Sequence, residues 1–314
     1  MLPDKSPEFA LIDSFREQLR ATTGVELGVG DDTAVVEWGS ACGLLAADML
    51  LDGVHFDTAT QSAELIGRKA LAVNLSDVAA MAGVPRFALV SLAIPKTARA
   101  GFADGIFTGL KSLADEFDLA IVGGDTNAWD GPFVINVSIV GDVARGNAVT
   151  RGGAKPGDWL FVTGELGGSL QGRHLTFPPR VNEALTLHNA VSLHAMLDIS
   201  DGLVADLYHI LEESDVGAIL EANAIPISQA AGRMSDDRSP LQHALGDGED
   251  FELLFAVSPE DGKRLMQDNP LDIRLSRVGE ITVEQNCRLK TEDGELNDLP
   301  RLGWSHGLSA ETNG

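Results

Sequence analysis

Short apolar runs alternate with helical stretches along the chain, and this alternation constrains the fold more than any other feature. The runs with the length of buried strands are residues 44–47, 87–94, 119–122 and 133–143. The stretches predicted as helices are residues 63–82, which Gly83 ends, and residues 102–117. Helices that alternate with strands pack on sheets, so the sequence predicts an α+β fold of mixed α/β layers.

A polar, glycine-rich segment near the midpoint predicts a domain boundary. It runs from Thr150 to Asp158, and a second set of strands and helices follows at residues 159–163, 195–199, 203–211, 251–257 and 273–278. A length of 314 residues suits two domains. We therefore expect an N-terminal domain over residues 1–147 and a C-terminal domain over residues 148–314. Ser6-Pro7-Glu8 predicts the start of a first helix.

Several aspartates lie at the ends of the apolar runs or interrupt a predicted helix. Four come at the end of an apolar run or just after one: Asp48, Asp125, Asp198 and Asp201. Asp77 interrupts a stretch that is otherwise almost free of charge, and Asp31-Asp32 ends the glycine-rich Gly28-Val29-Gly30. Because ligands in layered α/β proteins collect beyond strand ends, we expect these acids to meet in one pocket.

A pocket of carboxylates has a defined chemistry. Like charges that share a site are costly unless cations compensate them. Oxygen ligands without nearby His or Cys favour Mg²⁺, which bridges to substrate phosphates. Arg151, beside Gly152-Gly153, has the guanidinium fork that suits a phosphate. The acids therefore predict a nucleotide site with several Mg²⁺ ions, although the P-loop, dinucleotide-binding and protein-kinase motifs are absent from the sequence.

Each of these residues alone also fits a structural role. An Asp after a strand forms turns or caps helices, and Asp201-Gly202 stands directly before an amphipathic stretch. Asp77, with Asn74 one turn earlier, fits a solvent-facing stripe on a helix. Arg151 fits a solvated loop, so both interpretations stay open at this point.

The charge balance excludes several classes of partner. Asp and Glu number 47 against 23 Lys and Arg, which gives a net charge of −24. Such a surface repels nucleic acid and anionic membranes. The two cysteines, Cys42 and Cys287, do not make a Cys-rich metal site or a disulfide framework. With no signal-peptide pattern and no apolar run of ~20 residues, we expect a soluble, cytoplasmic protein.

Seven sequence motifs, spread over nearly the whole chain, occur together in one known family. They are Gly28-Val29-Gly30-Asp31-Asp32, Asp52-Gly53-Val54-His55-Phe56, residues 69–81, Gly123-Gly124-Asp125-Thr126, residues 151–158, Asp198-Ile199-Ser200-Asp201-Gly202-Leu203 and Gly248-Glu249-Asp250-Phe251-Glu252-Leu253. In these motifs the chain resembles the thiamine-monophosphate kinase family, within the PurM-like superfamily that includes aminoimidazole ribonucleotide synthetase and selenophosphate synthetase.

The resemblance implies a fold, a reaction and a set of site residues. The fold is the PurM-like two-domain fold, with N-terminal strands that pair into a barrel across a homodimer. The reaction is Mg²⁺-dependent transfer of the ATP γ-phosphoryl group to thiamine monophosphate, giving thiamine diphosphate and ADP. The implied metal ligands are Asp32, Asp48, Asp77, Asp125, Asp198 and Asp201, of which Asp77, Asp125 and Asp198 are the expected catalytic residues. The implied ATP contacts are Gly124, Asp125, Arg151 and Ser200, and the implied substrate contacts are His55, Glu249 and Trp304.

Two departures from the family pattern leave alternatives open. Ala46-Ala47 stands where members often carry hydroxyl residues, and the segment from Gly168 to Arg180 is short. An enzyme like aminoimidazole ribonucleotide synthetase, or an inactive acidic scaffold that retains the fold, are the alternatives. Selenophosphate synthetase would need a reactive cysteine earlier than Cys42, and the hydrogenase-maturation relative a C-terminal cysteine, and the sequence has neither.

Overall fold

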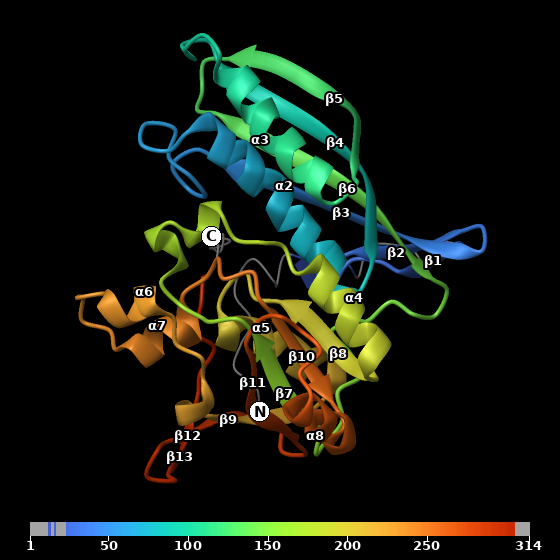
Figure 1. The fold of residues 1–314 in the computed structure, drawn as a ribbon, viewed down its shortest axis with the longest axis vertical. Helices are drawn as coiled ribbons and strands as arrows, with labels where there is room; N and C mark the ends of the chain where they lie inside the picture. Colours follow the sequence, from blue (N-terminus) through green and yellow to red (C-terminus); the bar gives the residue numbers. More distant parts are fainter. Residues whose placement is uncertain (1–11, 14–15, 17–22, 305–314) are drawn as a thin grey trace, which may run out of the picture.

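Two β-sheets, one in each half of the chain, organise the structure (Figure 1). The computed structural model describes residues 12, 13, 16 and 23–304. The helix start predicted at Ser6 lies outside the described residues. Within the described part of the chain, no helix combines the length and the apolar character that a membrane crossing requires.

The first sheet has six strands in the order β1-β2-β3-β6-β4-β5. Its strands are β1 (Val25–Leu27), β2 (Ala34–Trp38), β3 (Ala41–Leu51), β4 (Val84–Pro95), β5 (Ala120–Trp129) and β6 (Val134–Ala144). All neighbours are antiparallel except β4 and β5. Along β3 the buried Leu44 and Leu50 face the helices, whereas Leu45 and Met49 point to the other, exposed face. This period of two leaves one face of the sheet without a helical layer.

Two helices cover the buried face of this sheet, namely α2 (Ala63–Ala80) and α3 (Phe102–Glu116). Ser62 caps α2 by accepting a hydrogen bond from the N–H of Leu65. The helices approach closely at two glycines, since a Cβ on Gly67 would lie 2.0 Å from the carbonyl oxygen of Ile106, and one on Gly109 1.8 Å from that of Glu64.

The second sheet has seven strands in the order β13-β12-β9-β11-β7-β10-β8. Its strands are β7 (Trp159–Thr163), β8 (Leu193–Asp198), β9 (Gly217–Glu221), β10 (Leu253–Val257), β11 (Leu275–Thr282), β12 (Cys287–Lys290) and β13 (Leu296–Asp298). Only β9 and β12 are parallel neighbours. Its helices are α4 (Val181–Ala190), α5 (Leu203–Ser214), α6 (Gln229–Arg233), α7 (Pro240–Gly246) and α8 (Pro259–Gln267), with 3-10 turns η1 (Ser169–Gln171), η2 (Arg173–Leu175) and η3 (Ala222–Ala224).

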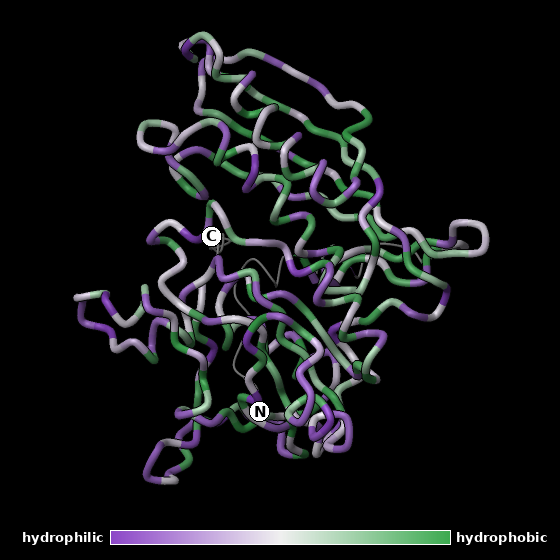
Figure 2. Tube along the Cα trace, viewed as in Figure 1, coloured by the Kyte–Doolittle hydropathy of each residue, from purple (hydrophilic) through white to green (hydrophobic). Residues whose placement is uncertain are grey.

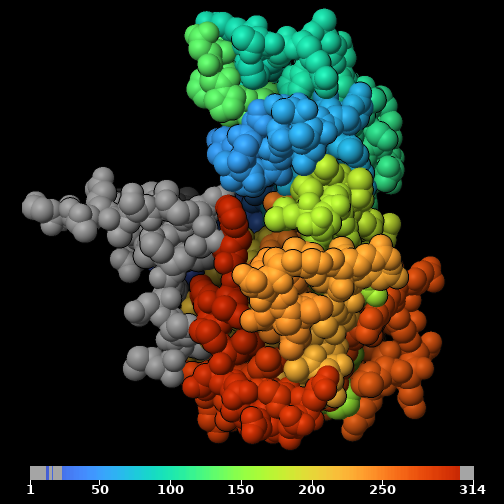
Figure 3. All heavy atoms as spheres, turned by 90° about the vertical axis from the view of Figure 1, so that its left-hand side faces the viewer, coloured from blue at the N-terminus to red at the C-terminus, as the bar shows by residue number. Residues whose placement is uncertain are grey.

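The central strands of the second sheet are buried on both faces. Along β10, Leu254 and Ala256 pack in one core cluster with α5, whereas Leu253 and Phe255 join the cluster that contains α2. In Figure 2 the hydrophobic residues accordingly concentrate in the strands and central helices, and the β12–β13 hairpin is hydrophilic. Helix α2 thus lies between the first sheet and the second half of the chain. Figure 3 shows this junction from the side, with the yellow-green segment near residue 170 between the blue and the orange parts.

The predicted mixed architecture of helices and sheets is confirmed. Both sheets are open within residues 23–304, and the barrel expected across a homodimer stays a prediction. Two details of the prediction are wrong. Asp48 and Asp125 do not end their strands, because β3 continues to Leu51 and β5 to Trp129. Ladder pairing with β6 and β4 extends these strands through residues that the local sequence marks as breaks. The boundary between residues 147 and 148 stays a prediction.

Candidate functional site

Three aspartates from distant parts of the sequence meet between the two halves of the chain. Asp32 comes from the loop between β1 and β2, Asp77 from α2 and Asp198 from the end of β8. One carboxylate oxygen of each lies within 4.8 Å of the others, a spacing compatible with a shared metal ion. Asp48 of β3 joins this group through a side-chain hydrogen bond with Asp77. We call these four residues the acid cluster.

Neighbouring side chains fix the cluster in place. The Ser76 hydroxyl donates a 2.5 Å hydrogen bond to Oδ2 of Asp198, and Nη2 of Arg151 donates one of 2.5 Å to Oδ1 of Asp32. The backbone N–H of Arg151 also donates to Oδ2 of Asp31 at 3.1 Å. Oδ2 of Asp32 is buried, and no hydrogen-bond donor for it is found among the residues that the structure describes. A cation that takes up this orphaned oxygen fits the donor set, which consists of carboxylate oxygens.

The electrostatics of the cluster are unfavourable as the residues stand. Burial, and then the charges of Asp48 and Asp198, raise the pKa of Asp77 well above its ordinary value. Burial and the charge of Asp32 raise the pKa of Asp198 to about 7. Burial likewise raises the pKa of Asp48. Such shifts mean that the ionised cluster needs compensating positive charge beyond that of Arg151.

Two cavities meet at the acid cluster. A cavity of about 250 Å³ has apolar and aromatic walls that include Val54, Phe251 and Trp304. A second cavity, of about 530 Å³, is lined by the glycine-rich segment 28–33 and by Arg151. Asp48, Asp77, Asp198 and Ser200 line both cavities. The arrangement thus brings two ligands, one in each cavity, to the same group of carboxylates.

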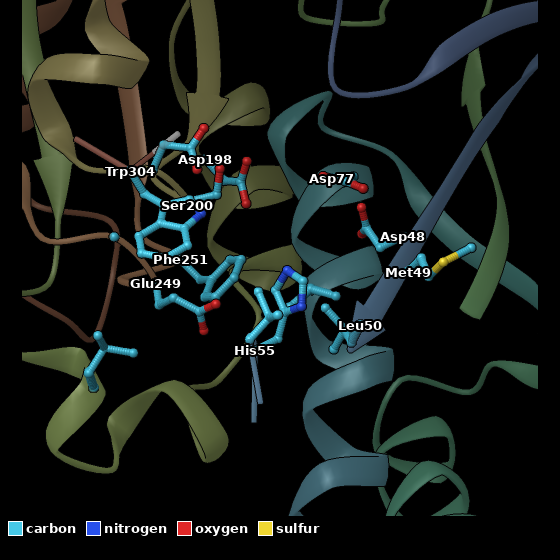
Figure 4. Close-up of a pocket in the computed structure, with 15 residues that line it drawn as sticks. Asp48, Met49, Leu50, His55, Asp77, Asp198, Ser200, Glu249, Phe251 and Trp304 are labelled. Atoms are coloured by element: carbon cyan, nitrogen blue, oxygen red, sulfur yellow. The ribbon is translucent and has the colours of Figure 1, made fainter. Parts of the chain in front are cut away.

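The first cavity collects the residues that the resemblance assigns to the substrate. Figure 4 shows Asp48 and Asp77 facing Asp198 and Ser200 across the space, with His55, Glu249 and Trp304 around the remaining wall. Nδ1 of His55 accepts a hydrogen bond from the N–H of Leu51 at 3.0 Å, so in the neutral imidazole Nε2 carries the proton. The N–H of Trp304 donates to the carbonyl of Asp201 at 2.9 Å. The indole itself is about half exposed at the mouth of the cavity.

The loop before β10 holds its residues in an uncommon conformation. Glu249 and Phe251 have φ values of 69° and 49°, in the left-handed region that side chains other than glycine disfavour. Their backbone N–H groups donate to the carbonyls of Ser200 and Ile199, at 2.6 and 2.7 Å. The ring of Phe251 stacks on Phe177 with 4.2 Å between centroids. Strained backbone held by such contacts is common where a ligand is bound.

Within this chain, the structure does not bring two expected residues to the site. Asp125 pairs with Ser91 in the ladder between β5 and β4, on the exposed face of the first sheet, opposite to the helices. Its carboxylate accepts a 2.7 Å hydrogen bond from Asn127. Gly124 precedes it on the same strand, and neither residue lines the two cavities. Gly124 has φ 156°, and a Cβ there would lie 1.8 Å from the carbonyl oxygen of Val90, so the strand pairing itself requires glycine.

Asp201 lines the first cavity but is not one of the three acids whose oxygens converge. The alternative role as a helix cap is not observed either, because Gly202 occupies the N-cap of α5 without a side-chain cap. Oδ2 of Asp206, one turn into the helix, accepts hydrogen bonds from the N–H groups of Asp201 and Gly202, at 3.0 and 3.1 Å.

Sequence reasoning missed some buried polar residues of this region. Asp206 and Lys69 are buried, and Ser76 is the donor to Asp198. The signal available was the one used for Asp77, namely a polar residue in an otherwise apolar helix. The segment from Gly168 to Arg180, expected to be short, forms η1 and η2. Ala46 packs against the core, and Ala47 lies on the exposed face of the sheet.

Comparisons with known proteins identify the family of this chain. A family model described as AIR synthase related protein, N-terminal domain, matches residues 30–143, and the corresponding C-terminal domain matches residues 155–292. The thiamine-monophosphate kinase of Rhodopirellula baltica is 39% identical over 310 residues, covering 96% of this chain and 97% of the relative. That of Escherichia coli K12 is 34% identical over 332 residues, covering 95% and 98%.

Solved structures give the same result. AaThiL complexed with AMPPCP and TMP superimposes with a TM-score of 0.83 at 31% identity, covering 95% of this chain and 96% of that one. Thiamine-monophosphate kinase from Stenotrophomonas maltophilia K279a gives a TM-score of 0.74 at 35% identity, covering 93% and 98%. The class is therefore the AIR synthase related, PurM-like two-domain fold. Within that class, the chain belongs to the thiamine-monophosphate kinase family.

Proposed function

We propose that this protein transfers the γ-phosphoryl group of ATP to thiamine monophosphate, giving thiamine diphosphate and ADP. The observation that carries the proposal is that two cavities share the acid cluster, so that donor and acceptor phosphates meet there. The attacking atom is a phosphate oxygen of thiamine monophosphate, which is ionised at pH 7. The transfer needs in-line positioning and charge neutralisation rather than a covalent nucleophile or a strong base.

The acid cluster is the proposed metal site. Asp32, Asp48, Asp77 and Asp198 would hold Mg²⁺, with Asp201 at the edge of the first cavity. Bound Mg²⁺ supplies the positive charge that offsets repulsion between the two phosphate groups. Arg151 stands with its guanidinium on Asp32, at the wall of the second cavity. There it orients Asp32 and faces the proposed ATP phosphates, and Ser200 lies where the two cavities join.

The first cavity has the chemistry of the proposed acceptor. The indole of Trp304 offers a flat surface on which an aromatic ring stacks. The carboxylate of Glu249 favours a cationic thiazolium, and the Nε2–H of His55 offers a hydrogen-bond donor. The phosphate end then points to the acid cluster at the other end of the cavity. AaThiL, 31% identical, was solved with AMPPCP and TMP, and this supports the assignment of ATP as the donor.

We further propose a homodimer in which the exposed faces of two first sheets pack together into a barrel. That face carries apolar side chains that are about half exposed, among them Met49, Leu89 and Val122. An apolar sheet face of this kind is typical of an interface. Asp125 lies on the same face, so a partner subunit that packs there is the proposed route by which Gly124 and Asp125 reach a nucleotide site. We place the reaction in the cytoplasm.

Incubation of the purified protein with ATP, Mg²⁺ and thiamine monophosphate tests the reaction. Thiamine diphosphate and ADP should appear in equal amounts, and EDTA should abolish both. Bound ATP without turnover would instead support an inactive scaffold. Turnover of a formylglycinamidine-type substrate alone would support a synthetase like the aminoimidazole ribonucleotide enzyme.

A further inference from the structure

Lys69 is a buried cation at the junction of the two halves, and the reaction described above does not use it. It lies on α2, and its side chain has no solvent-exposed surface. Lysine is almost never fully buried without a partner, because an ammonium loses several kcal/mol of hydration when it leaves water. A lysine at such a position therefore indicates that its ammonium binds polar groups of the protein and holds them in place.

Among the described residues, the ammonium of Lys69 has two partners, and each comes from a different half of the chain. It forms an ion pair with the carboxylate of Glu249, which lies in the loop between α7 and β10. It also donates a 2.6 Å hydrogen bond to the carbonyl oxygen of His55, in the loop between β3 and α2. Glu249 and His55 both line the first cavity (Figure 4). One buried group thus ties together two parts of the cavity wall.

The loop around Glu249 depends on such a tie. Glu249 has φ 69°, a conformation that costs free energy and persists only when surrounding contacts fix it. Its N–H is held by Ser200, and its carboxylate by Lys69. If the Lys69 ammonium is removed, the mostly buried Glu249 carboxylate loses its ion pair and can turn away from the cavity. The position of this carboxylate is therefore set from α2.

We propose that Lys69 is a positioning residue for the acceptor substrate. It fixes the Glu249 carboxylate and the His55 loop at the spacing that the thiazolium end of thiamine monophosphate requires. It does so without touching the substrate, because its side chain is covered. The inference rests on the proposed function and adds to it a residue that acts through Glu249.

The test compares Lys69→Met with Lys111→Met. Lys111 is an exposed lysine on α3 that pairs with Asp115, so its replacement makes the same charge change far from the site. We expect Lys69→Met to raise the KM for thiamine monophosphate about tenfold, or ~1.4 kcal/mol, and to leave the KM for ATP unchanged. Lys111→Met should leave both constants unchanged. Lys69→Gln, which keeps a hydrogen-bond donor, serves as the second variant where the Met variant does not fold.

A double-mutant cycle with Glu249→Gln separates positioning from general structure. If Lys69 acts through Glu249, Lys69→Met has little further effect on this KM when Glu249 is already Gln. An equal effect in both backgrounds, an unchanged KM, a parallel rise in the KM for ATP, or failure of both Lys69 variants to fold would each overturn the proposal.

Calorimetric titration with thiamine monophosphate in the absence of ATP keeps the two proposals apart. Wild-type protein that binds the compound but does not phosphorylate it contradicts the proposed function. A weaker affinity of Lys69→Met in that titration still supports the role of Lys69. Wild-type protein that does not bind thiamine monophosphate overturns both.

Discussion

At the scale of single residues, the acid cluster lowers the stability of the metal-free protein and favours the binding of a cation. Burial and mutual repulsion raise the pKa of Asp77 and Asp198, so the metal-free protein holds these carboxyls at a cost in folding free energy. The orphaned Oδ2 of Asp32 adds to that cost. A cation that binds there recovers this free energy on binding.

Replacing Asp77 by Asn tests this trade-off. We expect the metal-free variant to unfold at a higher temperature than the wild type, because a carboxyl whose ionised form is destabilised by burial and by its acidic neighbours is replaced by a neutral amide. Turnover should fall by roughly a hundredfold or more, since even outer partners of a metal site often contribute 10–100-fold. Thermal unfolding scans with EDTA and with Mg²⁺ make the measurement. The wild type should gain more from Mg²⁺ than the variant, and an equal gain in both would remove Asp77 from the site.

Asp250 gives a pH-dependent stability that is separate from the acid cluster. It accepts hydrogen bonds from the N–H of Gly167 at 2.8 Å and from the Ser169 hydroxyl, and burial raises its pKa to about 7. In the unfolded chain this carboxyl titrates near 3.8. Between these values the folded state binds the extra proton, so its contribution to stability is full below about pH 4 and is lost as the pH rises to about 7.

Comparison with Asp250→Asn isolates this contribution. The free energy of unfolding of the wild type, relative to the variant, should decrease by up to ~1.4 kcal/mol per pH unit between about pH 5 and pH 6.5. Urea denaturation in metal-free buffer at several pH values measures the difference. A difference that stays constant with pH would show that Asp250 is ionised throughout.

At the scale of elements, α2 is the helix that contacts most of the other parts of the fold. It packs on the first sheet, on α3 and on the second half of the chain, and most of its residues are buried, including Lys69 and Asn74. Its close contact with α3 depends on Gly67 and Gly109, where a side chain would meet backbone atoms. The helix therefore holds Asp77 in the acid cluster and Lys69 against Glu249 in the second half of the chain, both in fixed positions.

Replacing Gly109 by Ala tests the contact between α2 and α3. The new Cβ would lie 1.8 Å from the carbonyl oxygen of Glu64, so the helices have to separate. We expect a loss of about 1–3 kcal/mol in the free energy of unfolding, measured by urea denaturation. Gly232→Ala on α6 is the matched control, because no atom of the described residues lies within 4 Å of its Cβ position. Equal effects of the two substitutions would contradict the close approach.

At the scale of the whole molecule, the sequence predicts the elements better than their meeting points. Apolar periodicity locates α2, α3 and β7 to within two residues, because the burial that stabilises them is local in sequence. Motif resemblance singles out Asp32, Asp77 and Asp198, which the fold brings together. Local sequence does not reveal that β5 runs through Gly124, or that Lys69 meets Glu249. Those features depend on pairing across the chain.

The exposed face of the first sheet is the proposed dimer interface, and a charge placed on it tests this. Leu89 is 46% exposed on β4, within this face, so Leu89→Asp should separate the proposed homodimer into monomers and remove most of the activity. Phe107→Asp is the control, since Phe107 is also exposed but lies on α3, on the side of the sheet away from this face. Size-exclusion chromatography with light scattering should find a dimer for the wild type and the control. A dimeric Leu89→Asp variant with full activity would place the interface elsewhere and leave Asp125 outside the nucleotide site.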